Sequence, residues 1–126
     1  MKFTLSWLKD HLDTQATAEE IGDVLTNLGL ELEGLENKAE ELAPFKVAYV
    51  KEAAQHPNAD RLKVCTVDPG DGSDVQVICG APNAKTGMKG VFAPVGSYIP
   101  GIDTTLKAGK IRGVESNGML VSEREM

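Results

Sequence analysis

The sequence predicts an α+β protein in which a short helical segment precedes a small β-barrel or sandwich. The first observation behind this prediction is a change of the hydrophobic period from 3.6 to 2 near residue 45. The second is that clusters of Gly, Pro, Asp and Asn separate the later apolar runs at nearly regular spacing, as in small all-β domains. With 126 residues, the chain has room for one domain, or for a small domain with an appendage.

The first forty residues predict two helices. In "SWLKDHL", Leu8 and Leu12 lie four residues apart, as on one face of a helix. A second helix is indicated after Thr17, because Thr17 and Glu20 have the spacing of a capping box. Gly29 is placed to end that helix in a left-handed conformation. The buried face of the second helix would consist of Ile21, Val24, Leu25 and Leu28.

The segment after the second helix is predicted to lead into the β-rich part. "LELEGLE" alternates apolar and polar residues, which favours a short strand. "NKAEELAP" is polar and ends in proline, which favours a connection between domains. We therefore expect a helical segment over residues 1–40 and a β domain over residues 41–126.

The β domain is predicted from short runs rich in β-branched residues. Four of them stand out, namely "FKVAYVKEA", "RLKVCTVD", "DVQVICGA" and "KGVFAPVGSYI". The segment "VDPGDGSD" between the second and third runs is typical of a hairpin turn, since it lacks the ligand spacing of a calcium loop. The tail "LKAGKIRGVESNGMLVSEREM" is rich in glycine and small polar residues, which indicates loop and strand rather than a long helix.

Composition limits the possible function classes. No apolar run approaches the length of a bilayer span, and the charged N-terminus "MKFTLSWLKDHLD" lacks the apolar stretch of a signal peptide. A cytoplasmic location without a membrane partner is therefore expected. In that compartment Cys65 and Cys79 are expected to be reduced, buried thiols.

The charge is unevenly distributed along the chain. The formal net charge is −6, but residues 1–60 carry a net charge of −7 and residues 61–126 a net charge of +1. A polyanion would therefore have to bind a local patch in the second half, because the molecule as a whole does not attract it.

The stretch "HPNADRLKVCTVD" concentrates the residue types that form chemical sites. His56, Asp60, Cys65 and Cys79 are the candidates for a metal site, but no C-x-x-C or H-x-x-x-H pair is present, so no bound metal is expected. Cys65 and His56 could form a nucleophile and base, but no third residue to orient them is recognisable. No catalytic residue is therefore assigned. "VICGAPNAKTG" lacks the GK[ST] ending of a phosphate-binding loop, which argues against nucleotide binding.

Basic residues in glycine-rich loops favour nucleic-acid binding. A small barrel with such loops is typical of nucleic-acid-binding proteins, whereas the alternative is a solvated surface with no shared target. Aromatic residues make up only 5% of the chain, which favours contacts with the nucleic-acid backbone over base stacking. The basic residues in question are Arg61, Lys63, Lys85, Lys89, Lys107, Lys110 and Arg112.

Four sequence blocks, namely "HPNADRLKVCTVD", "VICGAPNAKTG", "GSYIPG" and "KIRGVESNGMLVSERE", resemble in the same order those of the tRNA-binding OB-fold family. Members of this family include the bacterial phenylalanyl-tRNA synthetase β subunit, some methionyl-tRNA synthetases and free-standing tRNA-binding proteins. The leading segments "MKFTLSWLKDHLD" and "IGDVLTNLGLELEGLE" resemble the start of the β subunit, which free-standing members are not expected to carry.

The resemblance implies a five-stranded Greek-key barrel, the OB-fold, preceded by a helical segment that forms part of a composite domain in a longer subunit. The chain would be an N-terminal fragment that stops before the last segment of the barrel. The implied enzyme attaches phenylalanine to tRNA with ATP and magnesium as an α2β2 assembly, with its aminoacylation site in the α subunit and its editing site further along β. This fragment would carry neither site and no cofactor.

Within the fragment, we expect basic side chains to contact phosphates and the residues of the "ESNGM" block to hydrogen-bond to backbone oxygens. The alternative is a structural domain of the synthetase with little direct tRNA contact. The residues expected to bind tRNA are Lys85, Lys107, Lys110, Arg112, Ser116 and Asn117.

Overall fold

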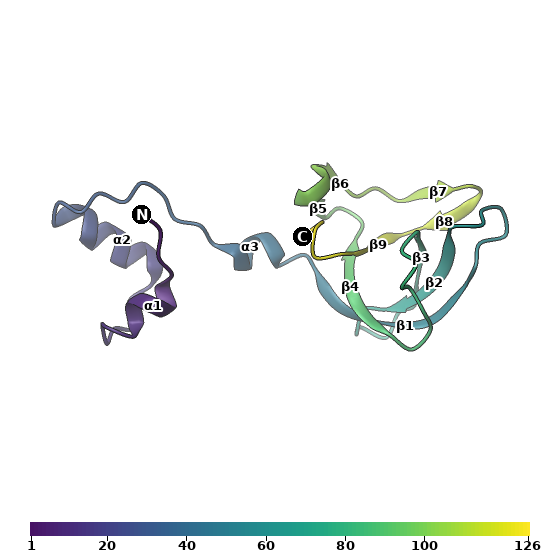
Figure 1. The fold of residues 1–126 in the computed structure, drawn as a ribbon, viewed down its shortest axis with the longest axis horizontal. Coiled ribbons are helices and arrows are strands. Elements are labelled where there is room, and N and C mark those ends of the chain that lie inside the picture. The colour runs from purple at the N-terminus through teal and green to yellow at the C-terminus, as the bar shows by residue number, and fades with distance from the viewer. The chain divides into compact units, whose positions relative to one another are not determined.

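The computed structural model describes all 126 residues. Contacts between residues divide the chain into two compact units, Met1–Lys38 and Ala39–Met126, which we describe separately. The first unit contains short helices and the second contains all of the strands (Figure 1). None of the helices is both long and apolar enough for a membrane span.

The first unit contains the two predicted helices, α1 (Leu5–Lys9) and α2 (Ala18–Asn27). The capping box of α2 is confirmed, because the Thr17 hydroxyl accepts from the Glu20 N–H at 3.2 Å and the Glu20 carboxylate accepts from the Thr17 N–H at 2.8 Å. The predicted stop is also confirmed, since Gly29 follows α2 with a φ of +91°.

The predicted buried face of α2 is wrong for this unit. Val24 is 56% and Leu28 is 73% exposed, and Gly22 is the only buried residue of the helix. A unit of this size has too little chain to cover that face.

The segment that follows α2 differs from the prediction. The strand expected in "LELEGLE" does not form, because Leu32 turns back onto α2 instead of pairing with another strand. The Leu32 N–H donates to the Thr26 hydroxyl, and the Leu32 side chain lies against Gly22, where it leaves no room for a Cβ. The connection itself contains one short helix, α3 (Lys38–Leu42), since Lys, Ala, Glu and Leu all favour helix.

The second unit is a β-barrel built on one five-stranded antiparallel sheet with the strand order β3-β2-β1-β4-β9. The placement of β4 beside β1, with β1, β2 and β3 consecutive, is the Greek-key arrangement. The predicted fold class is therefore confirmed as a small helical segment followed by an OB-fold barrel. The five strands are β1 (Lys46–Gln55), β2 (Lys63–Asp68), β3 (Val75–Cys79), β4 (Lys89–Pro94) and β9 (Gly118–Val121).

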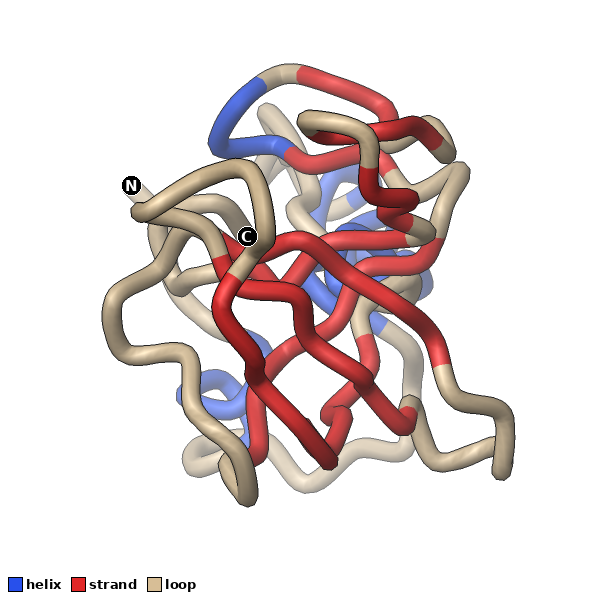
Figure 2. Tube along the Cα trace, turned by 90° about the vertical axis from the view of Figure 1, so that its right-hand side faces the viewer, coloured by secondary structure: helices blue, strands red, loops and turns tan.

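The sheet curls until its two edge strands, β3 and β9, contact each other (Figures 1 and 2). A β-bulge at Lys51 in β1 contributes to this curvature, because Val50 pairs with Val67 whereas Glu52 pairs with Thr66. The bulge also changes the inward-facing set of β1 from Ala48 and Val50 to Ala53. Two short ribbons complete the unit, β5 (Tyr98–Ile99) with β6 (Thr104–Thr105) and β7 (Gly109–Ile111) with β8 (Val114–Ser116).

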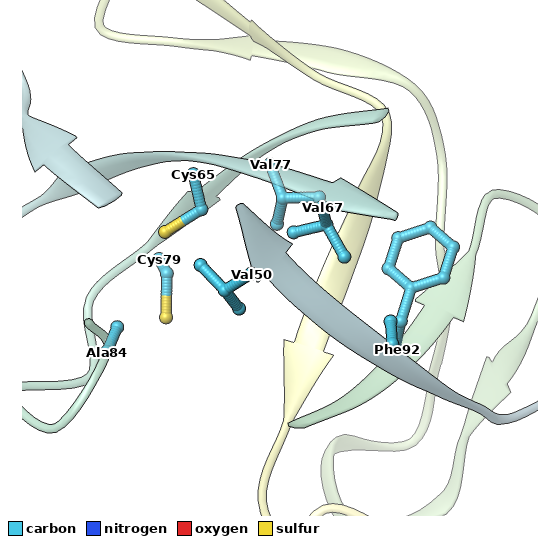
Figure 3. Close-up of a cluster of buried hydrophobic side chains, with 8 residues drawn as sticks. Val50, Cys65, Val67, Val77, Cys79, Ala84 and Phe92 are labelled. Atoms are coloured by element: carbon cyan, nitrogen blue, oxygen red, sulfur yellow. The ribbon is translucent and has the colours of Figure 1, made fainter. Parts of the chain in front are cut away.

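The barrel interior is filled by small and β-branched side chains, as the low aromatic content requires. Figure 3 shows side chains from β1, β2, β3 and β4 gathering around Val50, with the Phe92 ring at one side. A second buried cluster of Ala93, Ile99 and Val121 lies where β4 and β9 meet the β5–β6 ribbon. The first cluster consists of Ala48, Val50, Cys65, Val67, Val77, Cys79, Ala84 and Phe92.

We predict that Gly118→Ala destabilises the barrel strongly. A Cβ at this position would lie 2.3 Å from Cε2 of Phe92 and 2.8 Å from the carbonyl oxygen of Ala93, and the φ of +153° disfavours any side chain. We expect urea denaturation followed by circular dichroism to show a loss of about 2 to 4 kcal/mol in the free energy of unfolding.

The matched control is Gly109→Ala, because a Cβ at that position would meet no atom within 4 Å. Its free energy of unfolding should change by no more than about 0.5 kcal/mol. Equal stability of Gly118→Ala and the unchanged chain would contradict the packing of Phe92 against Gly118.

Candidate nucleic-acid interface

His56 is a structural residue whose two ring nitrogens are both engaged. The residue is 2% exposed, and its Nδ1 accepts from the backbone N–H of Asn58 at 3.0 Å. Nε2 must then carry the proton of a neutral ring, and it donates to the Ile111 carbonyl at 3.0 Å. In this arrangement neither nitrogen is free to bind a metal or to accept a proton from a nucleophile.

The two cysteines lie inside the barrel on neighbouring strands. Cys65 in β2 pairs with Val77, and Cys79 in β3 pairs with Lys63, which places both cysteines on the same face of the sheet. This face lines the barrel interior, where both thiols are buried (Figure 3). Both are free thiols, and burial raises the pKa of Cys65 above its ordinary value. No group of three His, Cys, Asp or Glu side chains converges in the structure.

The β7–β8 hairpin carries two exposed basic residues, Lys110 and Arg112. Its turn consists of Arg112 and Gly113, with φ values of +49° and +89°, as a two-residue type I′ turn requires. Arg112 is exposed at the turn and its guanidinium has no hydrogen bond or ion pair. Lys110 lies 4.0 Å from the Glu115 carboxylate across the hairpin, and both side chains are mostly exposed, so this ion pair is weak.

Lys85 and Lys107 occupy two other loops. Lys107 lies between β6 and β7 and leads into the hairpin, whereas Lys85 lies in the loop between β3 and β4. Both residues are exposed, and neither ammonium group has a partner within the chain. Lys107, Lys110 and Arg112 thus lie along one continuous segment, whereas Lys85 lies on a separate loop.

Ser116 has a role that sequence reasoning missed. It is 6% exposed, its hydroxyl accepts from the Ile78 N–H at 3.1 Å, and it donates to the Gly118 carbonyl at 3.2 Å. This hydroxyl therefore helps to close the barrel between β3 and β9. Asn117 is exposed, and its backbone N–H donates to the Gln76 carbonyl at 2.9 Å. Contacts of Ser116 and Asn117 with tRNA stay predictions.

Two of the other basic residues of the barrel form hydrogen bonds or ion pairs within the molecule. The Lys63 ammonium donates to the carbonyls of Ala84 and Pro82, which ties β2 to the loop after β3. The Lys51 ammonium pairs with the carboxylates of Asp74 and Asp68, and the hydrogen bond with Asp74 raises the pKa of Lys51. Lys51 and Lys63 are therefore less available to an external phosphate than the hairpin residues are.

The small Greek-key barrel is of the OB-fold class, which includes many oligonucleotide-binding modules, and it carries an exposed basic hairpin. The family described as "Putative tRNA binding domain" matches residues 45–126, which is almost the whole barrel unit. The chain belongs to this tRNA-binding-domain family, and the resemblance found in the sequence motifs is confirmed.

Individual relatives show a more specific similarity than the family match does. Over its whole length the chain is 61% identical to the phenylalanine--tRNA ligase beta subunit of Ruegeria pomeroyi and 63% identical to that of Rhodopseudomonas palustris. It spans 16% of the length of each relative and corresponds to the N-terminal region. Among solved structures, the MetRS related protein from Pyrococcus horikoshii is 28% identical with a TM-score of 0.50, covering 70% of this chain and 76% of that chain.

We predict that Cys65 and Cys79 are reduced, bind no metal and react with a thiol reagent such as DTNB only when the chain unfolds. Burial hinders access to both sulfurs, and the raised pKa of Cys65 lowers its thiolate fraction near neutral pH. The measurement compares reaction rates in buffer and in guanidinium, where both thiols should react rapidly. Stoichiometric zinc by elemental analysis, or unfolding by a chelator, would contradict this assignment.

Proposed function

We propose that the chain is the tRNA-binding module of a phenylalanine--tRNA ligase beta subunit and is accessory to the ATP-dependent attachment of phenylalanine to tRNA. The observation that carries the proposal is the family match across the barrel, together with relatives that bear this name. In the assembly that we propose, the chain works in the cytoplasm beside an α subunit in an α2β2 heterotetramer. Aminoacylation takes place in the α subunit.

The binding surface that we propose consists of the exposed basic residues of the hairpin, of the loop between β6 and β7, and of the loop between β3 and β4. Lys107, Lys110 and Arg112 follow one another along a single segment, so together they can contact consecutive phosphates. Lys85 adds a fourth charge from a separate loop. The β unit as a whole has ten basic and eleven acidic residues, so binding depends on this local arrangement and not on net charge.

ATP and magnesium belong to the assembled enzyme in this proposal. The residues of this chain offer no cluster of carboxylates or imidazoles for a cation, so no chemical step is assigned to them. Their contribution is to hold tRNA by its backbone.

The first unit is proposed to form part of a composite domain in the full subunit. It leaves large apolar side chains in solvent, including Trp7 at 58%, Leu28 at 73% and Leu30 at 66% exposure. Gly22 is its only buried residue. A unit of 38 residues with so little burial is marginal by itself, and the relatives extend far beyond the length of this chain.

The alternative function is a scaffold domain that touches tRNA little. The acidic first unit, with three basic and eight acidic residues, would support this alternative. The family match and the unpaired Arg112 favour tRNA binding, and a binding experiment separates the two functions.

We predict that the chain binds tRNA weakly and with strong salt dependence, and that Lys110→Ala combined with Arg112→Ala weakens binding. Fluorescence anisotropy titrations at several salt concentrations would measure the affinity. If two phosphate contacts are lost, the slope of log affinity against log salt should fall by about 1.4 to 1.8, at ~0.7 to 0.9 for each contact.

The matched control combines Lys46→Ala with Lys89→Ala, which removes the same charge from exposed positions on β1 and β4. This control should bind more tightly than the hairpin variant at every salt concentration. No binding at low salt would favour the scaffold function, whereas equal binding by both double variants and the unchanged chain would show that tRNA binds elsewhere than on the hairpin.

We predict that the helices of the first unit are only marginally protected when this chain is studied alone. Because the unit buries so little surface, backbone amides of α2 should show hydrogen-exchange protection factors below about 10. Amides of β1 and β2 should be protected by several orders of magnitude more. Equal protection of α2 and β1 would show that the first unit has a stable core of its own.

A further inference from the structure

The β7–β8 hairpin cannot hold its own shape. Each of its strands has three residues, and apart from Ser116 none of them is fully buried. A two-stranded hairpin of this length is unstable in water without external support. Arg112 adds strain, since an arginine at φ +49° is less favourable than a glycine or asparagine. A fixed position for the two basic side chains therefore requires contacts from elsewhere in the barrel.

The base of the hairpin is held by the edge of β3. Its anchors are the Ser116 hydroxyl on the Ile78 N–H and the Gln76 side chain, which donates to the Glu115 carbonyl at 2.8 Å. These contacts all lie at the β8 end that leads back into the sheet. They do not hold the turn, which contains Arg112, or the adjacent Lys110.

The turn of the hairpin is held by the segment between β1 and β2. The His56 Nε2–H donates to the Ile111 carbonyl at 3.0 Å, and the Asn58 side-chain amide donates to the Arg112 carbonyl at 3.2 Å. Two successive carbonyls on either side of the strained position are thus fixed by donors that lie 55 and 54 residues earlier in the chain. Lys110 directly precedes the first of these carbonyls, and Arg112 bears the second.

The holding segment is itself rigid. The His56 N–H donates to the Leu62 carbonyl at 3.0 Å, the Leu62 N–H donates to the Ala59 carbonyl, and the Gln55 amide bonds to the Ala59 carbonyl at 2.9 Å. Pro57 has its φ fixed by its ring. The bond from the Asn58 N–H to the His56 ring sets the tautomer that can donate to the hairpin.

We propose that His56 and Asn58 are positioning residues for tRNA binding, which hold the hairpin so that Lys110 and Arg112 meet phosphates without further ordering. This inference rests on the proposed function, because it concerns the same surface. Neither residue contacts the nucleic acid in this proposal. A hairpin that must be ordered during binding loses part of its affinity to that ordering, while the number of phosphates it can neutralise stays the same.

The experiment uses Asn58→Ala, because Asn58 is exposed and its side chain has the single partner Arg112, whereas loss of the buried His56 ring would disturb folding. Hydrogen exchange by NMR should show amides of residues 110–115 exchanging about three- to tenfold faster, as the loss of one such bond allows, with amides of β1 and β2 unchanged. Affinity for tRNA should fall about three- to tenfold. The salt slope should stay that of the unchanged chain, since no charge is lost.

The matched control is Asn27→Ala, an exposed asparagine at the end of α2, which should change neither hairpin exchange nor affinity. In the unchanged chain, imidazole ¹⁵N shifts should show His56 protonated at Nε2 and not at Nδ1. The opposite tautomer would overturn the hydrogen-bond arrangement behind the proposal.

The failure of this inference can be distinguished from the failure of the proposed function. If Asn58→Ala binds tRNA like the unchanged chain while the Lys110, Arg112 double variant binds more weakly, the positioning role is wrong and the binding surface stands. If the double variant also binds like the unchanged chain, the hairpin is not the binding surface, and both the proposed surface and the positioning role are overturned; if the unchanged chain does not bind tRNA at all, the proposed function itself fails. Faster exchange throughout the barrel would indicate a general loss of stability and would also overturn the positioning role.

Discussion

The closed barrel depends on hydrogen-bond partners for the backbone N–H and C=O groups on the outer edge of β3. A five-stranded sheet leaves unpaired N–H and C=O groups on its edge strands, which are costly when buried and prone to pair with another chain. Here the end of β8 and the residue after it supply the partners. The Ser116 hydroxyl accepts from the Ile78 N–H, the Asn117 N–H donates to the Gln76 carbonyl, and the Gln76 amide reaches the Glu115 carbonyl. At this seam, where the edge of β3 meets residues 115–117 and closes the barrel, side-chain and single backbone hydrogen bonds thus replace a regular strand ladder.

The same seam supports the surface proposed to bind tRNA. Because Ser116 ends β8, closing the barrel also anchors the base of the β7–β8 hairpin. Its turn is fixed separately by His56 and Asn58. A short, strained and exposed hairpin is thereby attached at both ends to a rigid barrel, which gives a small surface element a defined position without burying its charges.

The chemistry of the molecule is consistent with recognition of a nucleic-acid backbone. The His56 ring, which sequence reasoning weighed for catalysis, and the Lys63 ammonium, which it weighed for nucleic-acid binding, both have hydrogen-bond partners within the protein. The basic groups on the hairpin are largely unpaired and exposed. Tyr49 and Tyr98 are partly exposed, but Tyr98 donates to the Asp103 carboxylate at 2.6 Å, an interaction that raises the pKa of Tyr98. These two tyrosines are the only exposed aromatic residues of the barrel unit, which supports the proposal of phosphate contacts over base stacking.

The sequence by itself determined the local structure and the family. The capping box of Thr17 and Glu20, the stop at Gly29 and the hairpin in "VDPGDGSD" depend on residues that are neighbours in the chain, so periodicity and turn chemistry predicted them. The wrong strand in "LELEGLE" shows the limit of such patterns, since alternation indicates a strand but cannot supply a partner for it.

Only the tertiary structure decided the roles of Lys51, His56, Asn58 and Ser116. The bulge at Lys51 changes which residues of β1 face inward, and periodicity within one strand cannot reveal an extra residue opposite its partner. His56 meets the Ile111 carbonyl across 55 residues of chain, and Ser116 meets the Ile78 N–H across 38. These partners are backbone groups, which every residue has, so no sequence signal marks them. Their identity follows only from how the closed sheet brings distant segments together.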